Sequence, residues 1–591
     1  MTDSQDIQKR AILHHLHAFA PQDDQVDPLL VISLGRVLLK EARAGTSLPD
    51  IANGDQIRHI YDWLKAEVVT EAAWLSNVDE QGRPRKLMKF GSVDQILKEA
   101  DKAMMIANQR AGTAAIMAGD EEIIAELADG YSLVRMLSPA ALDRESRTMQ
   151  HCIGNGGYDD ELTKEWARFL SLRDASGNPH VTMDISINGD RMHINQIKGK
   201  QNAVPIAKYL SVLRPWFAKT NATLSYSPER GLMVSTNDEI YHVSELPDGF
   251  ECKRDFRAHE LEGARIPEGL KVHGHMSVIS DDGWKPQKHL PEGLYVDGDL
   301  TIKSRFIEVI SPNTRVKGDL KAGSTNISEI GEGLIVFEDC HLSGTKLEKL
   351  PSKMTVIGNL LITGTKITEI GDDVIMTSLS ASGSSLVSLS SKTKEYEEIK
   401  IDNTPIKRLP EGLKIAKLSA AGVTFDEFPK DLTVTEELVL YRAKIPTLSD
   451  TVVLPNDAFF EEAEIGEMIG DIVFDGPVPS QVNFRNAKIG KLPDSITVTE
   501  GDLMLSRSDI ATLPKHISVS GTLTLSNMPN LKELPDDVEV SCKILDLGFK
   551  PQMVLPEHWD VQTVLLADEV NSQIEMSADE YRSRYANNPK L

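Results

Sequence analysis

Cysteine is scarce in this chain of 591 residues. The four cysteines lie far from one another in the sequence, at Cys152, Cys252, Cys340 and Cys542. This spacing excludes a disulfide framework, and no C-x-x-C pair indicates zinc. The sequence therefore favours a reducing compartment and predicts neither a bound metal nor a cofactor.

Several histidines surround one of these cysteines. Cys252 lies among His242, His259, His273 and His275. Cysteine and histidine are zinc ligands, but this spacing follows no known zinc finger. We expect these side chains to be surface and cap residues of the repeats that begin here.

Long apolar runs are also missing. No stretch approaches the roughly 18 residues of a membrane span, and residues 1–23 are polar and lack a signal-peptide core.

Acidic residues outnumber basic ones, with 89 Asp and Glu against 64 Lys and Arg, which gives a net charge of −25. Such a surface repels phosphate backbones and disfavours nucleic-acid binding. We expect a cytoplasmic protein, or one delivered into a host cell without a cleavable signal peptide.

What the sequence does contain is a repeat. Between Leu246 and Leu555 a leucine or isoleucine, often followed by proline, two variable residues and another apolar residue, recurs about every 20 residues. A period of this length predicts a solenoid. One interval, Leu448 to Leu492, spans 44 residues. We interpret it as two coils whose middle anchor is lost near residues 465–469.

Each coil has the periodicity of strands. From Leu290 it runs L-P-E-G-L-Y-V-D-G-D-L-T-I, with apolar pairs at Leu294/Val296 and Leu300/Ile302 separated by a polar Gly turn. A single coil cannot bury its own apolar face, so neighbouring coils must stack around one continuous core.

The repeat resembles the leucine-rich-repeat family, L-x-L-x-x-N-x-L-x-x-L-P, in its short proline-bearing bacterial form. The Asn position is mostly Thr, Ser or Arg, as at Thr365, Thr404 and Arg507, so we expect a weak or absent Asn ladder. The step from Val296 to Leu300 is four residues, where the family usually has three. Two short strands per coil are also typical of a parallel β-helix, which stays as the alternative to the favoured leucine-rich-repeat-like solenoid.

The predicted fold class is a multidomain α+β protein. We expect a helical region at 1–130, an α+β module at 131–240, the solenoid at 241–568, and a C-terminal helix and tail at 569–591. Apolar spacing predicts helices near 27–43, 50–74, 93–107 and 121–128. The helical region is interpreted as a cap on the solenoid or on the next domain rather than as a docking bundle. Ser577 is expected to cap the last helix.

The α+β module contains the residues with chemical potential. Ser138-Pro139 predicts a helix that ends near Gln150 and is followed by His151 and Cys152. Strand-like runs at 167–173, 180–187 and 192–200 and a helix at 206–216 come next.

Two phrases of this module resemble the PcfJ-like family of conjugative plasmids, phages and mobile elements. They are His151-Cys-Ile-Gly154, with Tyr158 displaced by extra glycines, and Gln196-Ile-Lys-Gly-Lys-Gln-Asn202, with Arg173 on a strand between them. The match covers about 80 residues. It implies a shared α+β module and no established reaction.

One hypothesis makes Cys152 a thiol nucleophile. A nearby cation would lower the thiol pKa, Gln196 could donate to an oxyanion, and His193 or His180 suits the role of base better than the adjacent His151. On a regular strand His193 and Gln196 face opposite sides, so a shared pocket requires a bulge.

Two other interpretations remain open for the module. Arg173, Lys198, Lys200 and Asn202, beside Gln196 and the glycine loop, could bind an anionic or peptide ligand. Alternatively the module is structural, with Cys152 a small buried hydrophobe.

The repeats contain few of the side chains that anchor protein interfaces. The exceptions gather in the least regular part of the solenoid: Tyr441, Arg442, Phe459, Phe460, Phe484 and Arg485. They predict a partner site or, equally, residues that complete an irregular coil. The predicted function is a protein-interaction scaffold of bacterial, phage or mobile-element origin. The alternative is an effector-like enzyme that the solenoid targets to its partner.

Overall fold

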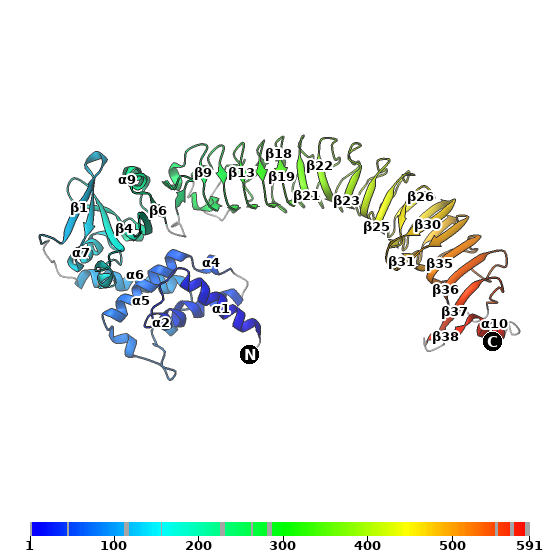
Figure 1. Cartoon of the computed structure of the whole chain (residues 1–591), viewed down its shortest axis with the longest axis horizontal. Coiled ribbons are helices and arrows are strands. Elements are labelled where there is room, and N and C mark those ends of the chain that lie inside the picture. Colours follow the sequence, from blue (N-terminus) through cyan, green and yellow to red (C-terminus); the bar gives the residue numbers. More distant parts are fainter. Residues whose placement is uncertain are drawn as a thin grey trace. The chain divides into compact units, whose positions relative to one another are not determined.

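The computed structural model describes residues 3–43, 47–110, 117–154, 156–224, 231–261, 264–279, 287–549, 553–567 and 573–585 (Figure 1). The chain divides into two compact units, residues 1–254 with 260–264, and residues 255–259 with 265–591. Among the described residues, no helix is both long enough and apolar enough to cross a membrane.

The first unit begins with helices. They are α1 (Asp3–His17), α2 (Asp27–Leu30), a π-helical turn (Val31–Gly35), α3 (Arg36–Arg43), α4 (Leu48–Ile51), α5 (Gly54–Val69) and α6 (Val93–Arg110). A capping box starts α5: the Asn53 side chain accepts from the Gln56 N–H, and the Gln56 side chain accepts from the Asn53 N–H. The apolar faces of α3 and α5 are buried. The helices predicted near 27–43, 50–74 and 93–107 are confirmed.

The helix predicted for 121–128 is wrong. These residues form β1 (Glu121–Glu126), which pairs antiparallel with β2 (Ser132–Met136). Asp129 and Gly130 have φ values of 58° and 75°, and this left-handed turn reverses the chain. Pairing with a neighbouring strand, a long-range contact, overrides the short helical pattern.

A six-stranded sheet in the order β1-β2-β3-β4-β5-β6 follows the helices. The later strands are β3 (Ala167–Arg173), β4 (Pro179–Asn188), β5 (Arg191–Lys198) and β6 (Ala222–Leu224). The helices of this part are α7 (Pro139–Met149), α8 (Asp159–Leu162) and α9 (Ala207–Thr220). The Ser138 hydroxyl accepts from the Ala141 N–H and caps α7, as predicted. One face of the sheet packs on Leu210, Leu213 and Phe217 of α9.

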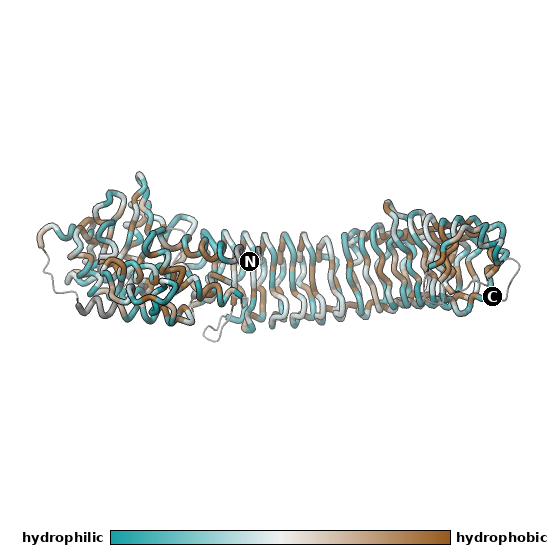
Figure 2. The backbone as a smooth tube through the Cα atoms, turned by 90° about the horizontal axis from the view of Figure 1, so that it is seen from below, coloured by the Kyte–Doolittle hydropathy of each residue, from teal (hydrophilic) through white to brown (hydrophobic). Residues whose placement is uncertain are grey.

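The second unit is a solenoid of stacked parallel strands. In one coil β13 (Tyr295–Val296) and β14 (Leu300–Lys303) pair in register with β16 (Arg315–Val316) and β17 (Leu320–Lys321) of the next. Hydrophobic and hydrophilic residues alternate along the coils (Figure 2). Leu294, Val296 and Leu300 are fully buried, so equivalent side chains of successive coils stack into one core.

Strands occupy more than one side of the coil. Separate small sheets form from β15 (Val309–Ile310) with β18 (Glu329–Ile330), and from β26 (Lys444–Ser449), β29 (Glu464–Ile469) and β32 (Lys488–Lys491). The described residues between 265 and 567 contain no α-helix. The predicted β-solenoid is confirmed, and its cross-section fits a parallel β-helix.

Buried threonines recur in the turns of several coils. The hydroxyls of Thr345, Thr365 and Thr404 are buried, and each donates at 2.7 Å to the carbonyl three residues earlier. Each hydroxyl is therefore satisfied within its own turn and forms no ladder from coil to coil.

The long interval between anchors does contain two coils. Leu448 of β26 pairs with Met468 of β29, and Glu464 pairs with Lys488 of β32. Met468 is buried. A methionine therefore fills the anchor position that the sequence left unassigned.

The solenoid ends in an antiparallel strand and a helix. β38 (Gln573–Ser577) pairs with β37 (Asp560–Ala567), and α10 (Ala578–Tyr585) follows. The Ser577 hydroxyl accepts from the Glu580 N–H, and the buried Tyr581 hydroxyl donates to the Met553 carbonyl at 2.7 Å. The helix cap is confirmed. The predicted tail at 587–591 lies outside the described residues.

Candidate functional site

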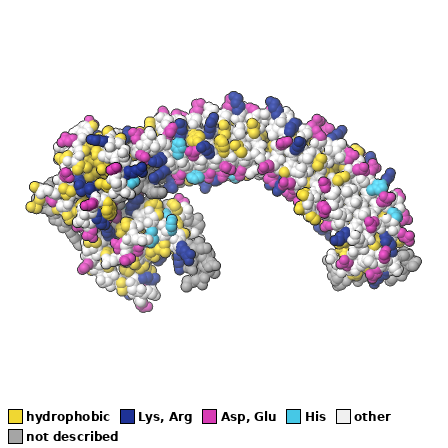
Figure 3. Space-filling view, viewed as in Figure 1, with side chains coloured by type: hydrophobic (Ala, Val, Ile, Leu, Met, Phe, Trp, Pro, Cys, Tyr) yellow, Lys and Arg dark blue, Asp and Glu magenta, His cyan; other side chains and the backbone are white. Residues whose placement is uncertain are grey.

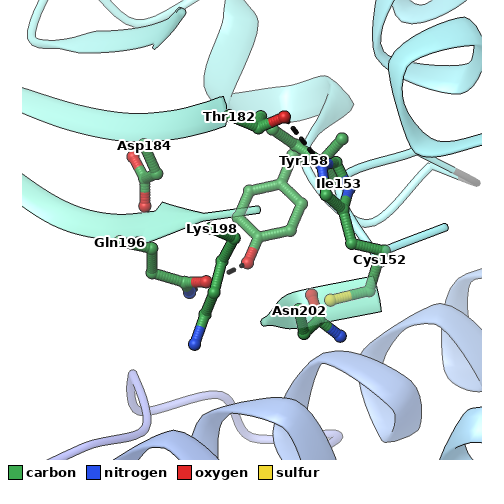
Figure 4. Close-up of a pocket in the computed structure, with 9 residues that line it drawn as sticks. Cys152, Ile153, Tyr158, Thr182, Asp184, Gln196, Lys198 and Asn202 are labelled. Atoms are coloured by element: carbon green, nitrogen blue, oxygen red, sulfur yellow. Dashed lines mark hydrogen bonds between the residues drawn. The ribbon is translucent and has the colours of Figure 1, made fainter. Parts of the chain in front are cut away.

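Three adjoining cavities in the first unit form one polar cleft. Their volumes are about 30, 160 and 460 Å³, and Gln196 of β5 lines all three. Other walls come from α5, from the loop after α7 and from β4. Figure 4 shows the innermost cavity, with Tyr158 between the strand residues Thr182, Asp184 and Gln196 and the loop residue Cys152.

A β-bulge gives the cleft its side chains. Asp184 pairs with Gln196 but the next residue, Ile185, pairs with Ile194, which leaves Asn195 as the extra residue. The alternation therefore reverses at Asn195, and Ile194 and Ile197 both face the core. His193 and Gln196 consequently share one face, which a regular strand would not allow.

Cys152 lies in the cleft as a protonated thiol. Gln150, with φ 58°, ends α7 in the left-handed conformation. The thiol two residues later donates to Oδ2 of Asp62 on α5 at 3.3 Å. Burial raises the pKa of Cys152 well above its ordinary value, and the charge of Asp62 raises it further, against a smaller opposing effect of Lys198. This environment is the opposite of the one that activates a nucleophilic thiol.

His151 belongs to a buried network behind the cleft. Its Nε2 lies 2.8 Å from Oγ1 of Thr182, which in turn donates to Oε1 of Glu145 at 2.6 Å. Thr182 therefore accepts from His151 Nε2–H. Burial lowers the pKa of His151 to about 4, so the ring is neutral. As a base for Cys152 it is unsuited, because a ring with a pKa of about 4 binds a proton only weakly.

Arg173 closes the same network. Its guanidinium pairs with Glu121 at 2.7 Å and with Glu145 at 3.3 Å, and Glu121 also pairs with Arg144 at 2.6 Å. Arg173 is 9% exposed and lines none of the three cavities. The structure therefore places Arg173 in this buried network and not on the wall of the cleft, where the sequence predicted a ligand-binding residue.

The remaining predicted residues divide between the cleft and the surface. Gln196, Lys198 and Asn202 line the cleft together with Cys152. His193 lies outside these cavities, 3.0 Å from the hydroxyl of Thr223, and Lys200 is exposed. His180, the other candidate base, pairs with Asp174 at 3.0 Å. The structure therefore does not assemble the predicted thiol site.

Sequence reasoning missed the carboxylates of the cleft. Asp62 lies between the buried Tyr61 and Trp63 on an apolar helix face, which is the one signal that could have identified it. Burial raises the pKa of Asp62. Burial, followed by the charge of Glu161, raises the pKa of Asp184 to about 7. Carboxylates that line a cavity and have a shifted pKa are typical of functional sites.

His59 of α5 was also missed. Its Nε2 lies 2.9 Å from Oδ1 of Asp101, and its Nδ1 lies 3.4 Å from Nδ2 of Asn202. It lines the 160 Å³ cavity. No sequence signal connects this helix with the strands, because the contact joins segments more than 140 residues apart.

The cysteine–histidine group around Cys252 is not assembled. The part of the chain that the structure describes has no group of three His, Cys, Asp or Glu residues that could hold a metal. His273 Nδ1 lies 2.7 Å from Asp297, and His275 Nδ1 accepts from the Asp299 N–H at 3.0 Å.

Two predicted partner-binding residues are core residues. Phe460 and Phe484 are fully buried and stack with ring centroids 4.5 Å apart, so their prediction as interface anchors is wrong. Phe459 and Arg485 are partly exposed. Arg442 is exposed, pairs with Glu462 at 2.7 Å and lies 4.7 Å from the Tyr441 ring.

We predict that Cys152 reacts slowly with an alkylating probe at pH 8 and that Asp62→Asn accelerates the reaction. Removing the carboxylate charge lowers the thiol pKa, and the thiolate fraction rises about tenfold for each pKa unit. Mass spectrometry of the native protein measures the rate, with the buried Cys340 and Cys542 as references. Rapid labelling of the unmodified protein, abolished by His193→Ala, would contradict this assignment.

Comparison of the chain with protein-family models, with curated proteins and with solved structures gives no match.

Proposed function

We propose that the chain is a protein-interaction scaffold whose solenoid binds a protein partner through an apolar strip formed by Phe337, Ile357 and Ile375. The observation that supports this function is their exposure, 42%, 52% and 60% on three successive coils. Single exposed hydrophobic side chains are ordinary, but neighbouring ones on a flat sheet are typical of an interaction surface.

The register of the coils places two of these side chains in one row. On successive coils Val296 pairs with Val316, Val316 with Val336, and Val336 with Val356. The residues that follow these valines therefore form one row: Asp297, Lys317, Phe337 and Ile357. Ile375 aligns with Thr355 and Ile335 in the neighbouring row. Phe337 and Ile357 therefore lie in one row on adjacent coils, and Ile375 lies on the next coil in the neighbouring row.

A polar rim adjoins the strip. Lys317 pairs with Asp297 at 2.7 Å and lies 5.5 Å from the ring of Tyr295, whose hydroxyl donates to the same Asp297. Figure 3 shows charged and hydrophobic side chains interspersed on one face of the solenoid. An apolar centre with a polar, already paired rim is the usual composition of a protein interface.

The proposed class of protein follows from the motifs. The L-P repeat supports a leucine-rich-repeat relative, and the phrases at His151 and Gln196 support a PcfJ-like module. Both favour a bacterial, phage or mobile-element protein that works in the cytoplasm or, like an effector, inside a host cell. The enzyme alternative has less support, because Cys152 is held as a thiol and His193 lies outside the cleft.

We expect Phe337→Ser/Ile357→Ser to lose the partner. Each exposed apolar contact at the centre of an interface contributes about 1 kcal/mol or more, so capture should fall at least about tenfold. The measurement is affinity capture from the native lysate, quantified by mass spectrometry. Val387→Ser, another solenoid side chain that is 50% exposed, is the matched control. An unchanged set of captured proteins in the double variant would refute the strip as the interface.

A further inference from the structure

Two carboxylates in the cleft form no ion pair among the described residues. Asp62 projects from α5 and Asp184 from β4, and both line the cavity of about 460 Å³. Asp62 is 8% exposed and accepts from the Cys152 thiol, and Asp184 accepts from Nδ2 of Asn195 at 3.3 Å. These partners are neutral. The volume lies within the range of about 300–1,000 Å³ of small-molecule sites.

The cations of the same cavity are already engaged. Lys65 pairs with Glu161 at 3.5 Å. Arg58 donates to the Asn195 carbonyl at 2.7 Å, and the Lys164 ammonium lies 5.1 Å from the Trp166 ring centroid. The wall thus contains three cations, Arg58, Lys65 and Lys164, and three carboxylates, Asp62, Glu161 and Asp184. Asp62 and Asp184 form no ion pair with these cations among the described residues, so their oxygens can accept from a cationic group.

Aromatic side chains form much of the remaining wall. Phe19, Tyr61, Tyr158 and Trp166 line the cavity, and Trp166 is 46% exposed. Cations bind favourably over such rings. The cleft already shows this contact, because Lys65 lies 5.7 Å from the ring centroid of Tyr158.

A buried acceptor also lacks a donor. His151 is 2% exposed, lines the innermost cavity, and its Nδ1 has no hydrogen-bond partner among the described residues. Because Nε2–H bonds to Thr182, Nδ1 is the unprotonated nitrogen and can only accept. This cavity shares Tyr158, Asp184 and Gln196 with the larger one. Nδ1 of His151 is therefore a further acceptor in the cleft that lacks a donor.

We propose that the cleft binds a guanidinium group, which donates to Asp62 and Asp184 and stacks on the aromatic wall. A guanidinium has five N–H donors in a plane and no acceptor. It is weakly hydrated and stacks on aromatic rings, whereas an ammonium is a compact, strongly hydrated point charge. The group belongs either to an arginine side chain of a peptide or to a small free guanidine. This site is independent of the apolar strip on the solenoid.

Calorimetric titration of the full chain at pH 8 tests the proposal. The probes are N-acetyl-L-arginine amide and agmatine, with N-acetyl-L-lysine amide and inorganic phosphate for comparison. We expect saturable binding of at least one guanidinium probe. Binding of the blocked arginine alone identifies a peptide side chain as the source, and binding of agmatine identifies a small free guanidine. No binding up to about 10 mM, equal binding of the lysine probe, or binding of phosphate in place of the guanidines would overturn the proposal.

Variants locate the site. Asp62→Asn and Asp184→Asn should each weaken guanidinium binding at least about tenfold, because each removes one charged acceptor. Asp160→Asn makes the same change of charge on an exposed residue of α8 and should bind as the unmodified chain does. Circular dichroism melting checks that each variant is folded. Unchanged binding by a folded Asp184→Asn variant would overturn the assignment.

The affinity should also rise between pH 6 and pH 8. The charges of Glu161 and Asp62 oppose ionisation of Asp184, and Asn195 and Arg58 favour it. The guanidinium binds the ionised form, so binding at pH 6 must first remove a proton from this carboxylate. An affinity that does not change over this range would contradict a role for Asp184.

Discussion

Replacing Arg173 with alanine destabilises the first unit by about 3–5 kcal/mol. The guanidinium lies between Glu121 and Glu145, and the Glu145 side chain has no exposed surface. Removing one partner of a buried pair leaves the other charge without compensation in a poorly solvated place. The cost is mainly the desolvation of Glu145, since Glu121 keeps its ion pair with Arg144, and not only the loss of the four hydrogen bonds that Arg173 donates to Glu121, Glu145 and Ser171.

The effect of Arg173→Ala is measured by hydrogen exchange with mass spectrometry, which assigns the destabilisation to peptides of β2 to β5. Arg168→Ala is the matched control, since Arg168 lies on the same strand and bonds the carbonyls of Glu165 and Ala167 rather than a carboxylate. We expect it to cost under about 1 kcal/mol. Equal effects of the two variants would show that the charge network adds nothing to stability.

Local signals predicted much of this unit correctly. The Ser138-Pro139 start of α7 and the hairpins after Arg173 and Asn188 depend on residues close in sequence. Capping and turn chemistry act within a few residues, so a sequence states them directly. The period of the repeat is a signal of the same kind, since each coil contacts its neighbours.

Long-range contacts account for what the sequence did not predict. Residues Glu121–Glu126 form a strand because they pair with β2. Such pairing overrides the helical propensity of a short segment. The bulge at Asn195 places Gln196 and Lys198 on the same face of the strand as His193. Strand periodicity assumes a regular strand, so it could not predict this bulge. Asp62 enters the cleft from a helix about 90 residues before Cys152. The cleft depends on this contact, so its chemistry could not be predicted from the module alone.

A second large effect is expected in the irregular part of the solenoid, where Phe460→Ala should cost about 3–5 kcal/mol. Phe460 follows β28 (Ala458–Phe459), and its ring stacks on Phe484 at 4.5 Å and meets Phe474 edge-on at 6.1 Å. All three rings are fully buried. Truncation leaves a cavity between coils that the stacked strands cannot close, because each strand is held in register on both sides.

Phe459→Ala separates the two interpretations of these aromatic residues. Phe459 is the neighbouring residue, partly exposed, and its loss should cost under about 1.5 kcal/mol. Denaturant unfolding, with hydrogen exchange of β26, β29 and β32 as the local probe, measures both variants. Because coils are stabilised by their neighbours, the cavity at Phe460 should also weaken protection in the coils on each side. A mild Phe460→Ala effect combined with loss of a captured partner would restore this residue as an interface anchor. A severe effect in Phe460→Ala and a small one in Phe459→Ala would confirm that the buried aromatic rings stabilise the core next to the coil in which Met468 replaces the L-P anchor.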